Sequence, residues 1–175
     1  MEYRTLEQEE LCLALFQGFR RHQVVNQCWR REHGRWVVRE APFIDDWGPA
    51  EYEILVRCLR NTLKENGFVY GAFTEDGLKG FVSVEGTPMG SRGQYLDLTS
   101  IHVSEDTRRL GTGRTLFQAA AAFARQRGAE KLYISAHSAV ESQAFYRSMG
   151  CVEAEEYQAE HVEQEPFDCQ LEYRL

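Results

Sequence analysis

The sequence contains no long uninterrupted run of apolar residues, which argues against a membrane protein. Its apolar stretches are far shorter than the roughly 20 residues that cross a bilayer as a helix. No charged start followed by an apolar stretch precedes a cleavage-like site, so we expect no secreted precursor. A linker, a low-complexity segment and an internal repeat are absent as well. With 175 residues, 43% of them hydrophobic, the chain suits one globular domain over residues 1–175.

An excess of basic residues is also missing. The 20 Lys and Arg residues are outnumbered by 27 Asp and Glu residues, so the net charge is −7. A nucleic-acid binder needs a basic face that neutralises phosphates. We therefore expect no nucleic-acid partner.

The cysteines lack the pattern of a disulfide framework or a zinc site. Their number is odd, and no two of them form a CxxC pair. The histidines are scattered singly, without the spacing of metal ligands. We expect reduced thiols, no metal and a cytoplasmic location. The cysteines are Cys12, Cys28, Cys58, Cys151 and Cys169.

The charges that are present are unevenly distributed. Six arginines lie between residues 20 and 39 against one acid, Glu32, and eight acids lie between residues 153 and 173 without a Lys or Arg. One interpretation is that both segments are solvated faces that pair with each other in the fold. The alternative is that the acidic segment attracts a cationic substrate.

Hydrophobic periodicity predicts an α/β (α+β) fold, a mixed sheet with helices on both faces. Pro49 suits the first turn of a helix that Asn66-Gly67 ends. We expect helices at 6–21, 49–65, 111–127 and 140–149. We expect strands at 68–73, 78–84, 95–103, 131–136, 151–157 and 167–175, the last two on either side of an acidic loop. Pairing of these last strands between two copies would give a homodimer.

A glycine-rich turn joins the strand at 95–103 to the helix that follows. Gly111 and Gly113 lie at the helix start, directly after Arg108 and Arg109. Free N–H groups and a partial positive charge make a helix N-terminus a cradle for an anion such as a diphosphate. The P-loop and Rossmann patterns both fail here, because no Lys-Ser or Lys-Thr pair and no third glycine follows. A purely structural turn is the alternative.

Arg108-x-x-Gly111-x-Gly113, after a strand that ends Ile101-His102-Val103, resembles the acetyl-CoA signature Q/R-x-x-G-x-G/A of the GNAT superfamily of N-acetyltransferases. Residues 142–151, SQAFYRSMGC, resemble the second block of that family, in which a tyrosine on a helix precedes a glycine. Two positions depart from the family: Arg109 stands where many members have glycine, and Ala139 where many have asparagine.

The resemblance implies a mixed, mostly antiparallel central sheet and acetyl-CoA as cosubstrate, without a metal. The N–H groups after Arg108 would hold the diphosphate, and the strand end would pair with the pantetheine arm as an added strand. Ser142 or Ser138 would replace the asparagine contact. The implied cofactor-binding residues are Ile101, His102, Val103, Arg108, Arg109, Leu110, Gly111, Thr112, Gly113, Arg114 and Ser142.

The reaction that the resemblance implies is transfer of acetyl to an amine without an acyl-enzyme. Asp97 is the only acid on the strand and is our candidate base. Strict alternation predicts that Asp97, Thr99, Ile101 and Val103 share one face. Tyr146 falls on the family's tyrosine and is the candidate acid that protonates the leaving thiolate. The structural alternatives are that Asp97 caps or pairs with a neighbouring strand and that the Tyr146 ring only packs.

The expected acceptor is a primary amine on a small molecule or a peptide, and the acidic charge favours a cationic one. The aromatic segment at 36–47 either covers the core or forms a wall of the acceptor pocket, with Asp45 and Asp46 touching a cation. The alternative function is a non-catalytic acyl-CoA-binding or sensor module, which would need neither Asp97 nor Tyr146.

Overall fold

A seven-stranded sheet with the strand order β1-β4-β5-β6-β7-β9-β8 forms the centre of the computed structural model, which describes residues 1–175. Every neighbouring pair is antiparallel except β6 and β7. The prediction of a mixed, mostly antiparallel sheet is confirmed. The strands are β1 (Glu2–Thr5), β4 (Phe68–Thr74), β5 (Gly77–Val84), β6 (Tyr95–Val103), β7 (Lys131–Ala136), β8 (Val152–Glu153) and β9 (Cys169–Arg174).

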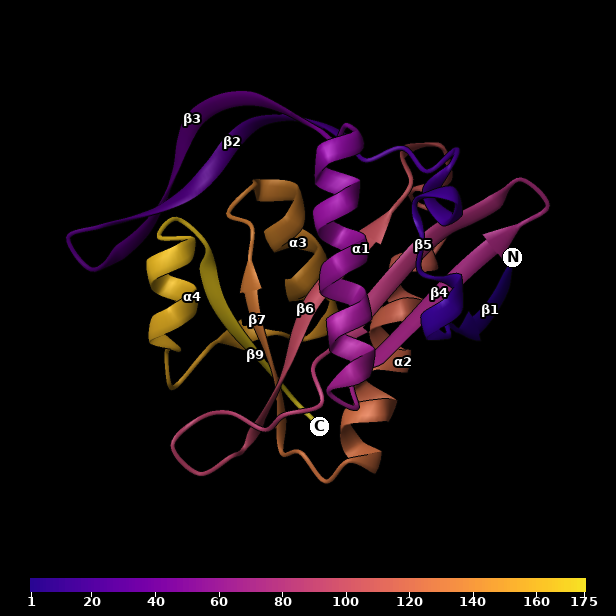
Figure 1. Ribbon diagram of the computed structural model, residues 1–175. Helices are drawn as coiled ribbons and strands as arrows, with labels where there is room; N and C mark the ends of the chain where they lie inside the picture. The colour runs from indigo at the N-terminus through magenta and orange to yellow at the C-terminus, as the bar shows by residue number, and fades with distance from the viewer.

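Helices cover both faces of this sheet, as predicted. In Figure 1, α1 (Pro49–Lys64) crosses in front of the strands and α2 (Thr112–Gln126) lies behind them. Helix α3 (Val140–Met149) shares the face of α2, since the rings of Phe117 and Phe145 meet edge to face with 6.4 Å between their centroids. No helix combines the length and the apolar character that crossing a membrane requires.

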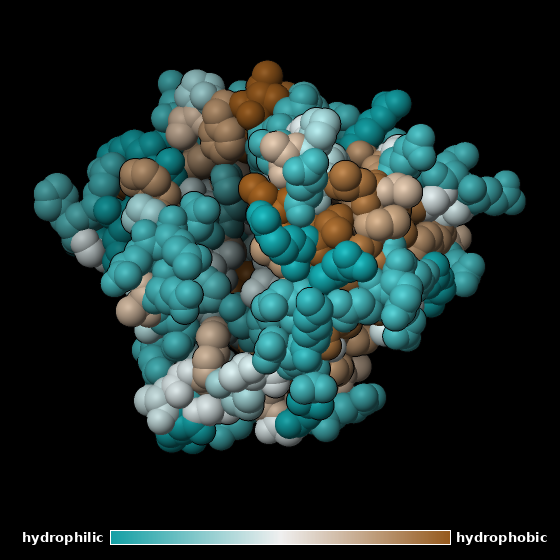
Figure 2. All heavy atoms as spheres, in the orientation of Figure 1, coloured by the Kyte–Doolittle hydropathy of each residue, from teal (hydrophilic) through white to brown (hydrophobic).

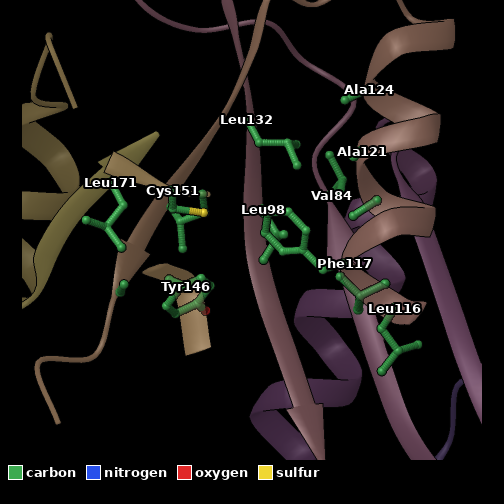
Figure 3. Close-up of a cluster of buried hydrophobic side chains, with 14 of the residues drawn as sticks. Val84, Leu98, Leu116, Phe117, Ala121, Ala124, Leu132, Tyr146, Cys151 and Leu171 are labelled. Carbon is green, nitrogen blue, oxygen red and sulfur yellow. The ribbon is translucent and has the colours of Figure 1, made fainter. Parts of the chain in front are cut away.

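Two apolar clusters hold the layers together. The larger one joins α2 and α3 to the sheet, and Figure 3 shows Leu98 and Leu132 between α2 and the Tyr146 ring. The smaller one lies beneath α1, around Phe81 and Leu59. Each fully buried Leu or Phe contributes roughly 1.5–3 kcal/mol of burial free energy, so both faces of the sheet are fixed by packing.

The predicted elements from residue 49 to residue 149 agree with the structure within one or two residues. The C-terminal part differs. Strand β8 has only two residues, and the expected acidic loop contains a short helix, α4 (Ala159–Gln164). Strand β9 lies between β7 and β8, so of the last two strands only β8 lies at an edge of the sheet.

The predicted helix at 6–21 is wrong. The segment forms two 3₁₀ turns, η1 (Gln8–Glu10) and η2 (Leu13–Phe16), and Gly18 has a left-handed φ of 87°. Tertiary packing overrides the helical periodicity, because Leu11 is fully buried beneath α1 whereas Leu13 is 48% exposed.

A long hairpin of β2 (His22–Glu32) and β3 (Arg35–Asp46) was not predicted from the sequence. Its two-residue turn is His33-Gly34, and both residues have positive φ, as tight hairpin turns require. The hairpin extends beyond the sheet (Figure 1) and rests on the loop before α3, where Trp29 N–H donates to the Ser138 carbonyl. The segment at 36–47 is therefore mostly strand β3.

A β-bulge in β6 overturns the predicted alternation. Ser100 pairs with Ser83 while Leu98 pairs with Val84, so Thr99 is an extra residue without a partner on β5. The bulge shifts the later residues by one position. Ile101 and Val103 consequently pack against the α2 side. Asp97 lies between Leu96 and Leu98, which both face α2, so its side chain lies on the opposite, α1 side.

We predict that Leu11→Ala lowers the free energy of unfolding by about 2–5 kcal/mol, since it leaves a cavity beneath α1. Leu13→Ala is the matched control, and its half-exposed side chain should cost no more than about 0.5 kcal/mol. Chemical denaturation followed by circular dichroism measures both. If the segment were a continuous helix with Leu13 on its buried face, Leu13→Ala would instead cost more unfolding free energy than Leu11→Ala.

Candidate active site

The edge of β6 beyond Asp97 has no neighbouring strand. Strands β6 and β7 pair only between residues 95–97 and 131–133, and Figure 1 shows them separating above that point. Ser104 N–H donates to the Lys79 carbonyl of β5. Alternate residues of an antiparallel strand bond to the same neighbour, so the backbone groups of Ile101 and Val103 point away from β5, towards the open edge. An extended ligand can therefore add to this edge as a strand.

The glycine turn presents a row of free backbone donors next to that edge. No N–H group from Arg109 to Arg114 has a hydrogen-bond partner in the structure, and the first bond of the helix runs from Thr115 N to Gly111 O at 3.1 Å. Gly111 has a φ of 84° and Arg109 a φ of 66°, which turns the chain sharply into α2. The six N–H groups and the helix dipole make this turn, with Leu110 exposed at its tip, fit a diphosphate.

The side chains around the turn have structural roles of their own. Arg108 donates to the Val103 carbonyl at 3.3 Å and to the His22 carbonyl at 2.5 Å, so it ties the start of β2 to the end of β6. Gly113 allows α2 to approach α3, because a Cβ there would lie 3.2 Å from the Phe145 ring. Thr112 is buried, and its hydroxyl has no partner.

Of the two serines proposed to replace the family's asparagine, one is already engaged. Ser138 is buried and accepts a 2.8 Å hydrogen bond from Arg30. Ser142 lies partly buried on the first turns of α3 and has no hydrogen-bond partner. Ser142 is thus the serine that is left available for a ligand.

His102 is held neutral at the end of β6. Arg21 Nε donates to its Nδ1 at 3.1 Å, and Trp47 packs edge-on against its ring at 4.8 Å. Desolvation and the positive charges of Arg21 and Arg108 lower the pKa of His102 to about 3. The imidazole therefore carries its proton on Nε2 and acts as a donor at neutral pH.

Asp97 forms a pair with a histidine that sequence reasoning missed. Its Oδ2 lies 2.6 Å from Nε2 of His161 on α4, and its Oδ1 is buried without a partner. The His161 ring stacks on Tyr133, with 5.6 Å between centroids. The hydrogen bond to Asp97 raises the pKa of His161 above its usual value. The only signal in the sequence was that His161 is the single histidine within the acidic segment.

Tyr146 approaches the opening between β6 and β7 from the opposite face of the sheet. Its ring packs in the larger apolar cluster beside Cys151 and Leu171 (Figure 3), and its hydroxyl makes no hydrogen bond within the protein. Burial raises the pKa of the Tyr146 hydroxyl well above 10, so the group keeps its proton at neutral pH.

A cavity of about 770 Å³ opens between α1 and the front of the sheet. Figure 2 shows this face, with a hollow near its centre. Thr99 and Ser100 of β6 line the cavity, which places it on the same face as Asp97. Glu85 also lines it and accepts a 2.7 Å hydrogen bond from Thr62.

The two acids at the end of β3 differ in availability. Asp45 forms a 2.6 Å ion pair with the largely buried Arg21, so its charge is already matched. Asp46 is mostly exposed and lies 3.5 Å from His22. The arginine-rich and acidic segments also meet directly, since Arg31 pairs with Glu153. No group of three His, Cys, Asp or Glu side chains is arranged as a metal site.

The open strand edge and the adjoining row of free N–H groups suit an extended anionic ligand, and comparison with known families places the protein in the class of acyltransferases. More specifically, the chain belongs to the acetyltransferase (GNAT) family, whose family model matches residues 16–151. The resemblance inferred from the glycine turn is thereby confirmed. No curated protein matches the chain in sequence.

Solved acetyltransferase structures share the fold. A candidate streptothricin acetyltransferase from Bacillus anthracis (strain Ames), in complex with acetyl coenzyme A, has a TM-score of 0.72 at 18% identity over 99% of this chain and 98% of its own. A nourseothricin acetyltransferase has a TM-score of 0.66 at 19% identity, covering 98% and 95%. A ribosomal-protein-alanine N-acetyltransferase from Brucella melitensis has 0.60 at 20% identity, covering 100% of both chains.

We predict that Gly111→Val weakens binding of acetyl-CoA at least tenfold, because a branched side chain resists the left-handed φ that aims the free N–H groups. Gly128→Val is the matched control, since Gly128 has a similar φ of 78° and open space at the other end of α2. Isothermal titration calorimetry measures both affinities. Equal loss in the two variants would assign the effect to strain alone and not to the cradle.

Proposed function

We propose that the protein transfers the acetyl group of acetyl-CoA to a primary amine on a cationic small molecule or peptide, by direct attack of the amine on the thioester. The observation that carries this proposal is the unbroken run of six unpartnered N–H groups from Arg109 to Arg114 beside an unpaired strand edge. The first feature suits the diphosphate, and the second suits the amides of the pantetheine arm.

The end of β6 supports the reaction centre in this proposal. The outward N–H groups of Ile101 and Val103 are hydrogen-bond donors for the pantetheine arm and for the oxyanion that develops at the thioester carbonyl. The fixed Nε2–H of His102 is a further donor at this end of the strand. Fixed donors need no rearrangement when charge develops, and this is why they stabilise a transition state.

The amine must lose a proton before it attacks. A lysine-like amine has a pKa of roughly 10.4, so nearly all of it is protonated at pH 7. We assign the base to Asp97 together with His161, the carboxylate–imidazole pair on the face that carries the cavity. The leaving thiolate then takes a proton from Tyr146, whose buried hydroxyl remains protonated at neutral pH.

The acceptor enters through the cavity between α1 and the front of the sheet in this proposal. Glu160 and Glu163 are exposed on α4, the helix that carries His161, and their charge favours a cation. The similar structures carry names that range from small-molecule to protein acetyltransferases. We expect the protein to work in the cytoplasm, where exposed thiols such as Cys12 and Cys58 stay reduced.

The test of this function is acceptor-dependent release of free thiol from acetyl-CoA. Polyamines, aminoglycosides, amino acids and lysine- or N-terminus-bearing peptides form the panel, with amino-group-blocked analogues as matched controls. We expect turnover with at least one cationic amine and none with its blocked analogue. Tight binding of acetyl-CoA without turnover across the panel would instead support a non-catalytic acyl-CoA-binding module.

We predict that Tyr146→Phe lowers kcat by about 10²-fold or more, the usual contribution of a general acid. The affinity for acetyl-CoA should change little, because Phe keeps the buried ring in place. Steady-state kinetics and calorimetry separate the two effects. Ser148→Ala, an exposed position on the same helix, serves as the control, and an unchanged kcat in Tyr146→Phe would remove the acid role.

A further inference from the structure

The Asp97–His161 pair has one side that a substrate can reach. Both oxygens of Asp97 are shielded: Oδ2 is bonded to His161, and Oδ1 is buried so deeply that water does not touch it. The His161 side chain is 25% exposed, against 9% for the side chain of Asp97. A proton that leaves an acceptor amine therefore meets the imidazole before it meets the carboxylate.

The ring of His161 is held in one orientation. Nε2 is bonded to Asp97, and the ring plane lies nearly parallel to the Tyr133 ring, at 22°. Nδ1 has no hydrogen-bond partner in the protein. An imidazole fixed by a carboxylate at one nitrogen, with the other nitrogen free, is the arrangement in which histidine accepts a proton from a substrate.

We propose that His161 Nδ1 takes the proton from the acceptor's ammonium group, and that Asp97 is a positioning residue that holds the ring and stabilises its protonated form. This inference rests on the proposed N-acetyltransferase function and assigns a catalytic residue to it. His161 comes from α4, within the segment that the sequence analysis treated as a loop.

The groups around His161 agree with this role. Asp97 faces it from β6, the Tyr133 ring from β7, Asp168 from the residue before β9, and Glu160 from its own helix. The hydrogen bond to Asp97 and the charges of Glu160 and Asp168 raise its pKa, against the opposing effect of partial burial. The pKa of the imidazole therefore lies above its ordinary value of about 6.5, in the direction that favours acceptance of a proton.

The step balances without a further reagent. The ammonium N–H bond breaks, and its proton forms a bond to Nδ1 of His161. The neutral amine attacks the thioester carbon, so a C–N bond forms and the C–S bond breaks. The thiolate takes a proton from Tyr146, and the second proton that the nitrogen loses restores the Tyr146 hydroxyl. Protonated His161 then returns its proton to water.

The deciding experiment compares His161→Gln with wild type over pH 5.5–9.5, using an acceptor found in the panel. Gln can still donate a hydrogen bond to Asp97 but cannot take up a proton, so it separates positioning of α4 from proton transfer. Gln164→Ala, an exposed position on the same helix with no role in the proposed site, is the matched control. Ionisation of the acceptor affects all variants equally, so only differences between their profiles are interpreted.

We expect wild type and Gln164→Ala to share a rise of kcat/KM with pH through the pKa of His161. His161→Gln should lack this rise and lose about 10²–10⁴-fold in kcat/KM at neutral pH, with unchanged affinity for acetyl-CoA. Retention of both the rate and its rise with pH would overturn the role of His161 while leaving the proposed function intact. Absence of acceptor-dependent turnover in wild type would overturn both.

A second measurement is independent of turnover. The imidazole of His161, followed by NMR, should titrate above 6.5 in wild type and at a lower pH in Asp97→Asn, because the stabilising negative charge is gone. A value below 6.5 in wild type, or no shift in Asp97→Asn, would show that Asp97 does not support a protonated His161 and would overturn the proposal.

Discussion

The separation of β6 from β7 after Asp97 is the constraint on which the site depends. While the two strands pair, their backbone groups satisfy each other; once they part, β6 has polar groups on one edge that only a ligand or water can satisfy. The chain then turns through Gly111 into α2, which adds free N–H groups directly beyond that edge. An unpaired strand edge is ordinarily a liability, but here helices of both layers flank it, which suits the extended thioester that we propose as its ligand.

The bulge at Thr99 gives the two faces of β6 different chemistry. Before it, Leu96 and Leu98 pack on the α2 side; after it, Ile101 and Val103 do so. Without the extra residue, one of these two pairs would face α1 and the cavity. The bulge thus keeps one face continuously apolar and leaves the other to polar side chains, among them Asp97 and His102. Asp97 and the neutral His102 consequently share a face, while Tyr146 approaches from behind the sheet.

Sequence reasoning recovered what is encoded locally and missed what is decided by tertiary contacts. The helix start at Pro49, the strand at 95–103 and the glycine turn at 111–113 each have a local signal, and the structure agrees with them. The segment at 6–21 has helical periodicity, yet its side chains fill a crevice beneath α1 that no local pattern describes. The bulge at Thr99 depends on the register between β5 and β6, which the spacing of residues in one strand does not reveal. The pairing of Asp97 with His161 joins residues 64 positions apart, so no local pattern could predict it.

The N-terminal segment and the hairpin complete the electrostatics of the site, although the family signature lies elsewhere. Arg21 is bonded both to His102 and to Asp45 of β3, so one buried guanidinium fixes the imidazole and has its own charge matched. If Arg21 lacked Asp45, an unmatched positive charge would remain buried at the end of β6, beside the neutral His102. The hairpin thus belongs to the site through Asp45, which neutralises the residue that holds His102 and is itself already paired. In the proposed function, attraction of a cationic amine falls to other acids, among them Glu160 on α4 beside His161.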